Sequence, residues 1–360
     1  MKIDIVRQRL RNQRLASTGF DSPPDVVAWL GAVQAQDFAG AKWAVGQRAR
    51  GVTDADVERA FDSGLILRTH VLRPTWHFVA PADIRWMLAL TAPRVHARNG
   101  PGYREFELDD RLLTKSRRIV EHALQGGRQL TRSELAAALR RGGIEASGVR
   151  LAHLIMHAEL EGVICSGARR GRQFTYALLA ERAPDAMMLD RDEALAELTR
   201  RYFTSHGPAT LRDYSWWSGL TMRDARTGIE MSKQTLAEEA VDGLSYWQAP
   251  SSADAGRGRA SRAYLLPNYD EYLIAHKDRG WVVESPPPVA RGAVEHPHHV
   301  IVDGTLRGSW KRTLGIKSAG VDVRPFRPLN REDASAVTAE AERYGRFLGM
   351  PVTVNIVRRP

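Results

Sequence analysis

The sequence predicts an α+β protein in which helix pairs followed by short hairpins recur before a β-rich end. Two helical patterns, a turn between them and a basic hairpin after them occupy residues 128–190, and a similar order of elements stands on either side. After residue 263, alternating apolar residues and tight-turn signals replace the helical periodicity. Helix, turn, helix and hairpin make a winged helix, so we expect three tandem winged-helix units and a small β-rich region, at residues 1–127, 128–190, 191–249 and 263–360.

The unit at 128–190 has the clearest start and stop signals. Thr131 and Glu134 stand at the spacing of a capping box, in which each side chain accepts a hydrogen bond from the other residue's backbone N–H. Gly142 breaks this helix, Ser147 can cap a second one, and Gly162 ends it. Apolar residues at helical spacing give the second helix one buried face: Leu151, Leu154, Ile155 and Ala158. Two strands, at 163–165 and 174–178, then flank a loop.

The unit at 191–249 follows the same order of elements. A helical pattern at 195–203 precedes two further helix starts, at Thr210 and Thr221. Asp242-Gly243 is a dipeptide typical of a two-residue hairpin turn. We therefore predict a further winged helix here, the third unit of the chain, which resembles the unit at 128–190 in architecture and not in sequence.

The amino-terminal unit is the least regular of the three. Helical patterns at 5–15 and 24–34, and a helix start at Thr53, precede a strand pair at 65–79. This strand pair can serve as a third wing.

The C-terminal region starts after a segment poor in core-forming residues, 250–262, which we expect to be a flexible insertion. Asp303-Gly304 indicates a hairpin at 299–311. Further strands and one crossing helix complete a predicted small sheet, at 264–266, 321–323, 351–356 and 331–347.

Composition points to a polyanionic partner. The 360 residues include 52 Lys+Arg against 42 Asp+Glu, a formal net charge of +10, which favours nucleic acid. No apolar run approaches the roughly 18 residues of a membrane helix, and the start lacks a signal-peptide core, so we expect a cytoplasmic protein without a membrane partner. The single cysteine, Cys165, lies in an apolar run and is interpreted as a core residue.

Gln34 and Gln36 form the first candidate site. Carboxamides can orient a water or stabilise a developing charge but cannot take up a proton, so their chemistry requires a leaving group that needs little acid or base help. Residues two apart do not face each other on a helix, so the pair can share a pocket only if the predicted helix ends or distorts there, which nearby Gly40 permits. Alternatively, both amides only cap a helix end.

The hairpin at 65–79 alternates polar and apolar residues. Counting by two places Arg68 and His70 on one face of the first strand, and Arg73, Thr75 and His77 on one face of the second. The pattern predicts a wet, cationic face that grips DNA phosphates or enters a groove. A merely solvated face explains it equally well.

Two further basic groups are candidate DNA contacts. Arg169, Arg170 and Arg172 lie in the loop of the wing at 163–178, where phosphate contacts are common, although such charges are often only solvated. Around Trp310 in the later hairpin lie Arg307, Lys311 and Arg312. Trp310 could stack a base there, but a lone tryptophan in a strand is more often a core residue.

Other chemically notable residues receive no catalytic role. Asp270 and Glu271 are adjacent, so on an extended segment they point apart, and a buried ion pair or helix cap is the better interpretation. His296, His298 and His299 without a cysteine are weak evidence for a metal site, and we assign no metal. The sequence holds no nucleotide-binding glycine motif, and we expect no cofactor.

Four segments together resemble the AlkZ/YcaQ-like family of bacterial DNA glycosylases over nearly the whole chain. They are Gln34-Ala35-Gln36 and the stretches 73–79, 266–273 and 304–312. The resemblance implies tandem winged helices arranged as a C-shaped clamp around DNA. It implies excision of alkylated or interstrand-crosslinked purines, and the Gln-x-Gln form is similar to the branch that protects producers of alkylating natural products such as azinomycin.

The same resemblance implies that Gln34 and Gln36 are catalytic. A purine alkylated at N7 or N3 is already cationic, so its bond to C1′ can break without protonation of the base. The two amides would hold the attacking water and stabilise the sugar cation, in a monofunctional, metal-free hydrolysis that leaves an abasic site. We expect a monomer acting on double-stranded DNA that contains alkylated purines.

Two alternatives remain at this stage. A non-catalytic winged-helix DNA-binding protein or transcription regulator would account for the charge and the wings, but not for the glutamine pair. An enzyme acting on small molecules through Asp270 and Glu271 would leave the basic wings without a use.

Overall fold

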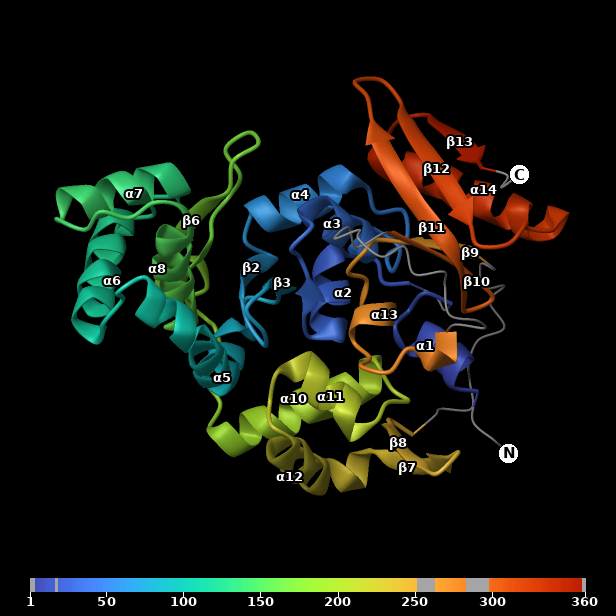
Figure 1. Cartoon of the computed structure of the whole chain (residues 1–360), viewed down its shortest axis with the longest axis horizontal. Helices are drawn as coiled ribbons and strands as arrows, with labels where there is room; N and C mark the ends of the chain where they lie inside the picture. Colours follow the sequence, from blue (N-terminus) through green and yellow to red (C-terminus); the bar gives the residue numbers. More distant parts are fainter. Residues whose placement is uncertain (1–3, 17–18, 251–262, 283–297, 358–360) are drawn as a thin grey trace.

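A computed structural model describes residues 4–16, 19–250, 263–282 and 298–357. Its elements follow an arc, with helices of the second winged helix at one end, the N-terminal unit in the middle and the C-terminal sheet at the other end (Figure 1). Within these described ranges, no helix combines the length and the apolar character needed to span a bilayer. The predicted insertion falls almost entirely outside the described residues.

The N-terminal unit differs from the sequence prediction in the segment that carries Gln34. Gly31 has φ +75° and ends helix α2 at Leu30, so Gln34 lies in a short strand and not in the predicted helix. The sequence patterns also missed helix α3. The elements of this unit are α1 (Ile5–Asn12), α2 (Pro23–Leu30), β1 (Val33–Gln34), α3 (Phe38–Gly46), α4 (Asp54–Asp62), β2 (Leu67–His70) and β3 (Trp76–Val79), with sheet order β1-β3-β2.

Two long helices, α5 (Ile84–Glu105) and α6 (Asp110–Leu124), were not predicted. Helix α5 contains two prolines, Pro93 and Pro101, which obscure a helical pattern. It contacts helices of the second and third units, while α6 packs on α7 and α8. The core of the second unit therefore reaches back to Leu108, before residue 128.

The second unit has the predicted order of a winged helix. The capping box of Thr131 and Glu134 is present, and the predicted apolar face of the second helix is buried. Its elements are β4 (Leu130–Thr131), α7 (Arg132–Arg141), α8 (Gly148–Leu160), β5 (Ile164–Ser166) and β6 (Thr175–Leu178), in the sheet order β4-β6-β5. Cys165 is buried as expected, and burial raises the pKa of its thiol to about 12. A short helix α9 (Leu179–Arg182) follows.

The third unit also follows its sequence signals. Capping boxes start α11 at Thr210 and α12 at Thr221, and Asp242 and Gly243 form the turn, both with positive φ. The elements are α10 (Arg191–Ser205), α11 (Leu211–Ser218), α12 (Met222–Ser232), β7 (Ala237–Val241) and β8 (Leu244–Gln248).

The C-terminal region is a five-stranded sheet that shares a core with the N-terminal unit. Its order is β13-β12-β11-β10-β9, antiparallel except for the β12–β13 pair. Helix α14 packs between this sheet and helices α3 and α4, and the Trp43 indole donates to the Leu265 carbonyl oxygen (2.7 Å). The elements are β9 (Ala263–Leu266), α13 (Glu271–Ile274), β10 (His298–Val302), β11 (Thr305–Leu314), β12 (Ala319–Pro325), α14 (Arg331–Leu348) and β13 (Val352–Ile356).

Candidate active site

Gln34 and Gln36 lie beside each other because the chain leaves the helix before it reaches them. The backbone N–H of Gln36 donates to Oε1 of Gln34 (3.2 Å). Gln34 is almost fully buried, at 4% exposure, while Gln36 is exposed. The break that permits this contact is Gly31, and not Gly40 as the sequence suggested. One amide thus lies behind the surface and the other on it.

Gln36 lines a cleft of about 690 Å³ between the N-terminal unit and the second winged helix. The first unit contributes Gln36, Arg68 and Trp76. The second contributes the start of α7 and the wing, with Thr131, Arg132, Ser133, Leu151, Arg172, Gln173, Phe174 and Tyr176. This volume is within the range of small-ligand sites, and the lining contains no aspartate, glutamate, histidine or lysine.

Glu271 holds the strand that carries Gln34. Its fully buried carboxylate accepts hydrogen bonds from the backbone N–H of Gln34 (2.9 Å) and the indole N–H of Trp217 (2.9 Å). Nε2 of His206 lies 3.4 Å from the same carboxylate. A buried carboxylate thus stands directly behind the amide pair, a role that the sequence did not reveal.

The neighbouring Asp270 confirms the interpretation of a buried ion pair and helix cap. Its carboxylate binds the Arg48 guanidinium through two 2.8 Å contacts, and both side chains are fully buried. It also accepts from the backbone N–H of Tyr272 at the start of α13. Asp270 and Glu271 therefore position the site from behind, and neither lines the cleft.

The predicted cationic face of the β2–β3 hairpin is not solvent-exposed, and its members do not share one face. Arg68 is paired with Phe78, and His70 with Trp76, so Arg68 and His70 share their face with the aromatic residues. Directly paired residues of antiparallel strands project to the same side of a sheet, which the sequence pattern could not show without the register. The prediction of a wet face was therefore wrong.

Arg68 and His70 are held by protein groups. The Arg68 guanidinium lies between the rings of Trp76 (4.2 Å) and Phe174 (4.5 Å), and its Nε donates to the carbonyl oxygen of Ala35 (3.1 Å). Burial lowers the pKa of Arg68 to about 10. His70 pairs with the buried carboxylate of Glu159.

Arg73, Thr75 and His77 carry polar atoms that no described residue satisfies. His77 is opposite Gln34 in the β1–β3 register and is fully buried, and its Nδ1 contacts the Thr75 carbonyl oxygen (2.9 Å). Nε2 of His77, Oγ1 of Thr75 and two guanidinium nitrogens of Arg73 are buried without a hydrogen-bond partner among those residues. Burial and the nearby Arg73 hold the pKa of His77 well below its usual range, so the ring is neutral. Such atoms can form hydrogen bonds with a polar ligand or with water.

The three wing arginines have different surroundings. Arg169 pairs with Glu58 (2.9 Å) and Arg170 with Glu134 (2.8 Å), so these two connect parts of the protein. Arg172 is exposed on the cleft. Only Arg172 thus retains the surroundings expected of a phosphate contact.

The C-terminal hairpin shows a similar division. Arg312 makes two contacts (2.8 and 2.9 Å) with Asp37, the residue that caps α3 directly after Gln36. Arg307 is half-buried, and Lys311 is exposed. Trp310 belongs to the core, where a lone tryptophan in a strand is more often found. Beyond the predicted residues, Ile316 at the end of β11–β12 is 97% exposed.

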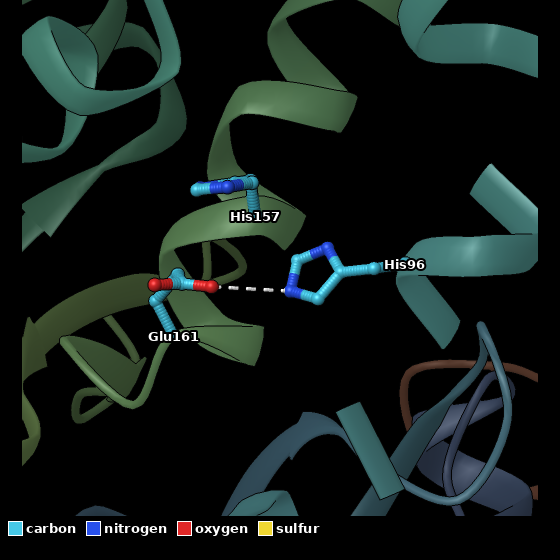
Figure 2. A group of neighbouring side chains, drawn as sticks. All are labelled: His96, His157 and Glu161. Carbon is cyan, nitrogen blue, oxygen red and sulfur yellow. Dashed lines mark ion pairs between the residues drawn. The ribbon is translucent and has the colours of Figure 1, made fainter. Parts of the chain in front are cut away.

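His96, His157 and Glu161 form a second polar group, away from the cleft lining (Figure 2). Nε2 of His96 lies 3.3 Å from the Glu161 carboxylate, and Arg117 binds the other oxygen of that carboxylate (2.7 Å). Burial, and then the neighbouring His96, lower the pKa of His157 to about 4. Three such ligands could in principle hold a metal ion, but the Arg117 cation already neutralises the only carboxylate. The group connects α5 to α8.

A winged helix beside a cleft lined by arginines, aromatic rings and amides is typical of a nucleic-acid-binding protein. The AlkZ-like DNA glycosylase family matches residues 27–347, and the chain belongs to this family. It is therefore a DNA glycosylase, and this excludes the purely regulatory alternative.

Two relatives support this assignment over the whole chain. The interstrand DNA cross-link repair glycosylase of Streptomyces sahachiroi is 26% identical over 357 residues, and the alignment covers 95% of each chain. The solved structure of the Streptomyces sahachiroi DNA glycosylase AlkZ superposes with a TM-score of 0.82 at 25% identity, covering 99% of this chain and 100% of that one. The resemblance inferred from the sequence is confirmed.

Proposed function

We propose that this glycosylase hydrolyses the N-glycosidic bond of purines made cationic by alkylation at N7 or N3, with Gln34 and Gln36 as catalytic residues. One observation carries the proposal: the cleft that Gln36 lines offers no carboxylate, imidazole or amine. The hydroxyl of Tyr176, which also lines the cleft, stays protonated because burial raises its pKa. Without a strong acid or an amine nucleophile at hand, the base must leave unaided, and a cationic purine does so.

The step is a hydrolysis that balances without a cofactor. The C1′–N9 bond breaks, its electron pair neutralises the alkylated purine, and the sugar becomes an oxocarbenium ion. Water adds to C1′ and loses its proton to solvent, leaving an abasic site. The carbonyl oxygen of Gln36 orients this water in the cleft, and the carbonyl oxygen of Gln34 stabilises the sugar cation from directly behind it. Each contributes about 3 kcal/mol by analogy with oxyanion-hole donors.

The buried carboxylate of Glu271 supports the same chemistry. It fixes the backbone of Gln34 through a 2.9 Å hydrogen bond, so the amide is positioned before substrate binds. Its negative charge behind the cleft also favours a cationic transition state over a neutral one. Ordinary purines, which need protonation to leave, are spared.

DNA is held by basic residues at the edge of the cleft and by the C-terminal hairpin. Arg132 and Arg172 are exposed at its edge and suit phosphates, and the exposed Ile316 of the C-terminal hairpin suits an apolar contact with base edges. Because the cleft lies between two units and opens to solvent, it also suits bulky or crosslinked bases, as the name of the Streptomyces relative suggests.

A glycosylase assay tests the proposal. Duplexes containing N7-methylguanine, N3-methyladenine or unmodified purine are incubated with the enzyme, and abasic sites are revealed by mild alkali. We expect release of the two cationic bases only. Gln34→Ala and Gln36→Ala should each lower the single-turnover rate by about 100-fold while DNA affinity changes less than about threefold.

Gln173→Ala is the matched control, because it removes the other carboxamide that lines the same cleft as Gln36. We expect it to retain the wild-type rate. Excision of neutral purines at a comparable rate, or wild-type activity in the Gln34 and Gln36 variants, would contradict the proposal.

A further inference from the structure

A second basic hollow lies on the second winged helix, between α6 and α7. It has a volume of about 1110 Å³ and shares no lining residue with the cleft of Gln36. In Figure 1, α6 stands at the outer end of the molecule, with α8 and β6 between it and β2. We call this hollow the α6–α7 groove; basic residues on its lining are Arg111, Lys115, Arg118, Arg128 and Arg141.

One row of basic residues follows α6. Arg111, Lys115, Arg118 and His122 stand at i, i+4, i+7 and i+11, so they share one helix face and extend over about 16 Å. All four are exposed. The row thus presents at least three positive charges to solvent on one line.

These cations are not paired with acidic groups within the described part of the chain. Arg111, Lys115, Arg118 and Arg141 make no ion pair with any residue that the structure describes, whereas nearby Arg117 pairs with Glu161. Like charges at i, i+4 destabilise a helix slightly, and an anion laid along the row removes that cost. The row therefore fits a ligand with several regularly spaced negative charges.

Helix α7 connects the groove to the cleft. Thr131 and Arg132 at its start line the cleft, and Arg141 at its end lines the groove. Its ten residues extend about 15 Å, which corresponds to roughly four to five base pairs of duplex. Between these ends, Ala136 and Ala137 are only partly buried, and their side chains are small. A sugar-phosphate backbone can therefore pass closely over the helix.

We propose that the α6–α7 groove is a DNA-binding site for the sugar-phosphate backbone of the duplex that flanks the lesion, beginning about five base pairs from the excised base. This rests on the cleft of Gln36 being the excision site. An acidic protein segment would also match the charge, but the enzyme's own polyanionic substrate already lies at the other end of α7.

The test measures affinity against duplex length and salt. The probe is a duplex with a central tetrahydrofuran abasic-site analogue, made about 12 or about 30 base pairs long. The variant is Arg111→Gln/Lys115→Gln/Arg118→Gln. On the long duplex we expect a 10- to 100-fold weaker affinity, roughly, near physiological salt, and a plot of log K against log salt that is shallower by about 2 to 3. On the short duplex the change should stay below about threefold.

Arg7→Gln/Arg331→Gln/Arg346→Gln is the matched control, since it removes the same charge from exposed positions on α1 and α14, both on the side of the molecule away from α6. It should leave the salt dependence nearly unchanged. Arg111→Lys/Arg118→Lys keeps the charges and should keep the affinity, which separates charge from folding. For Arg111→Gln/Lys115→Gln/Arg118→Gln, the single-turnover excision rate at saturating enzyme should equal that of the wild type. A failure of the groove assignment is therefore distinguishable from a failure of the assignment of Gln34 and Gln36.

Three results would overturn the inference. Equal losses in the α6 variant and the control would indicate a general charge effect. Equal losses on both duplex lengths would place the residues within the lesion footprint. Unchanged affinity on every duplex would exclude DNA and leave the groove to an acidic protein partner.

Discussion

The β2–β3 hairpin and helix α6 both carry several basic residues, and the protein uses them in opposite ways. In the hairpin, Arg68 is buried between two aromatic rings and His70 pairs with Glu159. On α6, Arg111, Lys115 and Arg118 are exposed and have no ion-pair partner in the described part of the chain. The difference teaches that periodicity identifies a face, whereas only the neighbouring elements decide whether that face meets solvent.

The consequence is a division of labour that mutations can separate. Polar groups in and behind the cleft should control the rate of excision and the stability of the fold. Exposed cations on α6 should control affinity for DNA and its salt dependence.

The largest effect is expected at Gln36. Gln36→Ala should lower single-turnover excision by at least about 100-fold, because the amide that stabilises the sugar cation is lost. Arg118→Ala should leave this rate within about twofold. Rates at saturating enzyme, measured with N7-methylguanine duplex, check both. A comparable loss of rate in Arg118→Ala would remove the distinction between the two regions.

Glu271→Gln should come next. The amide oxygen still accepts from the Gln34 N–H, but the buried charge is lost and the NH2 end cannot accept from the Trp217 indole N–H. We expect a loss of about 2 kcal/mol in the free energy of unfolding and about a tenfold slower excision. Denaturant unfolding and the glycosylase assay measure the two quantities. Unchanged excision would mean that Glu271 has only a structural role.

Arg68→Gln compares a buried cation directly with an exposed one. Loss of both ring contacts and of the packing by the guanidinium should lower the free energy of unfolding by about 1 to 2 kcal/mol. Arg118→Gln should change it by less than about 0.5 kcal/mol. Urea denaturation of both variants gives the values. Equal stability of the two would show that the stacked arginine contributes no packing energy.

The smallest effect concerns pH. Because burial lowers the pKa of His77 in the folded state, the unfolded chain binds more protons below its ordinary pKa of about 6.5. The stability contribution is complete above that pH and is lost as pH falls below it. His77→Gln should remove about 0.7 kcal/mol of the stability difference between pH 7 and pH 6. His122→Asn on α6 is the control, since its ring is exposed in the fold, and it should keep the wild-type pH dependence.

Local signals predicted many elements correctly. Capping boxes at Thr53, Thr131, Thr210 and Thr221 are all present, because the residues that form them are close in sequence. The same holds for the turns at Asp242-Gly243 and Asp303-Gly304. Helix α5 was missed because two prolines interrupt its pattern, whereas α6 does carry an amphipathic pattern with a buried apolar face.

The sequence by itself determined the family, the three helix-and-hairpin units and the two glutamines as candidates, because these depend on motifs and on spacing along the chain. The tertiary structure alone decided what surrounds each side chain. Glu271 reaches Gln34 across 237 residues, Arg312 reaches Asp37 across 275, and Arg68 meets Phe174 from another unit. A charge acts according to the groups that folding brings beside it, and no local pattern specifies those neighbours.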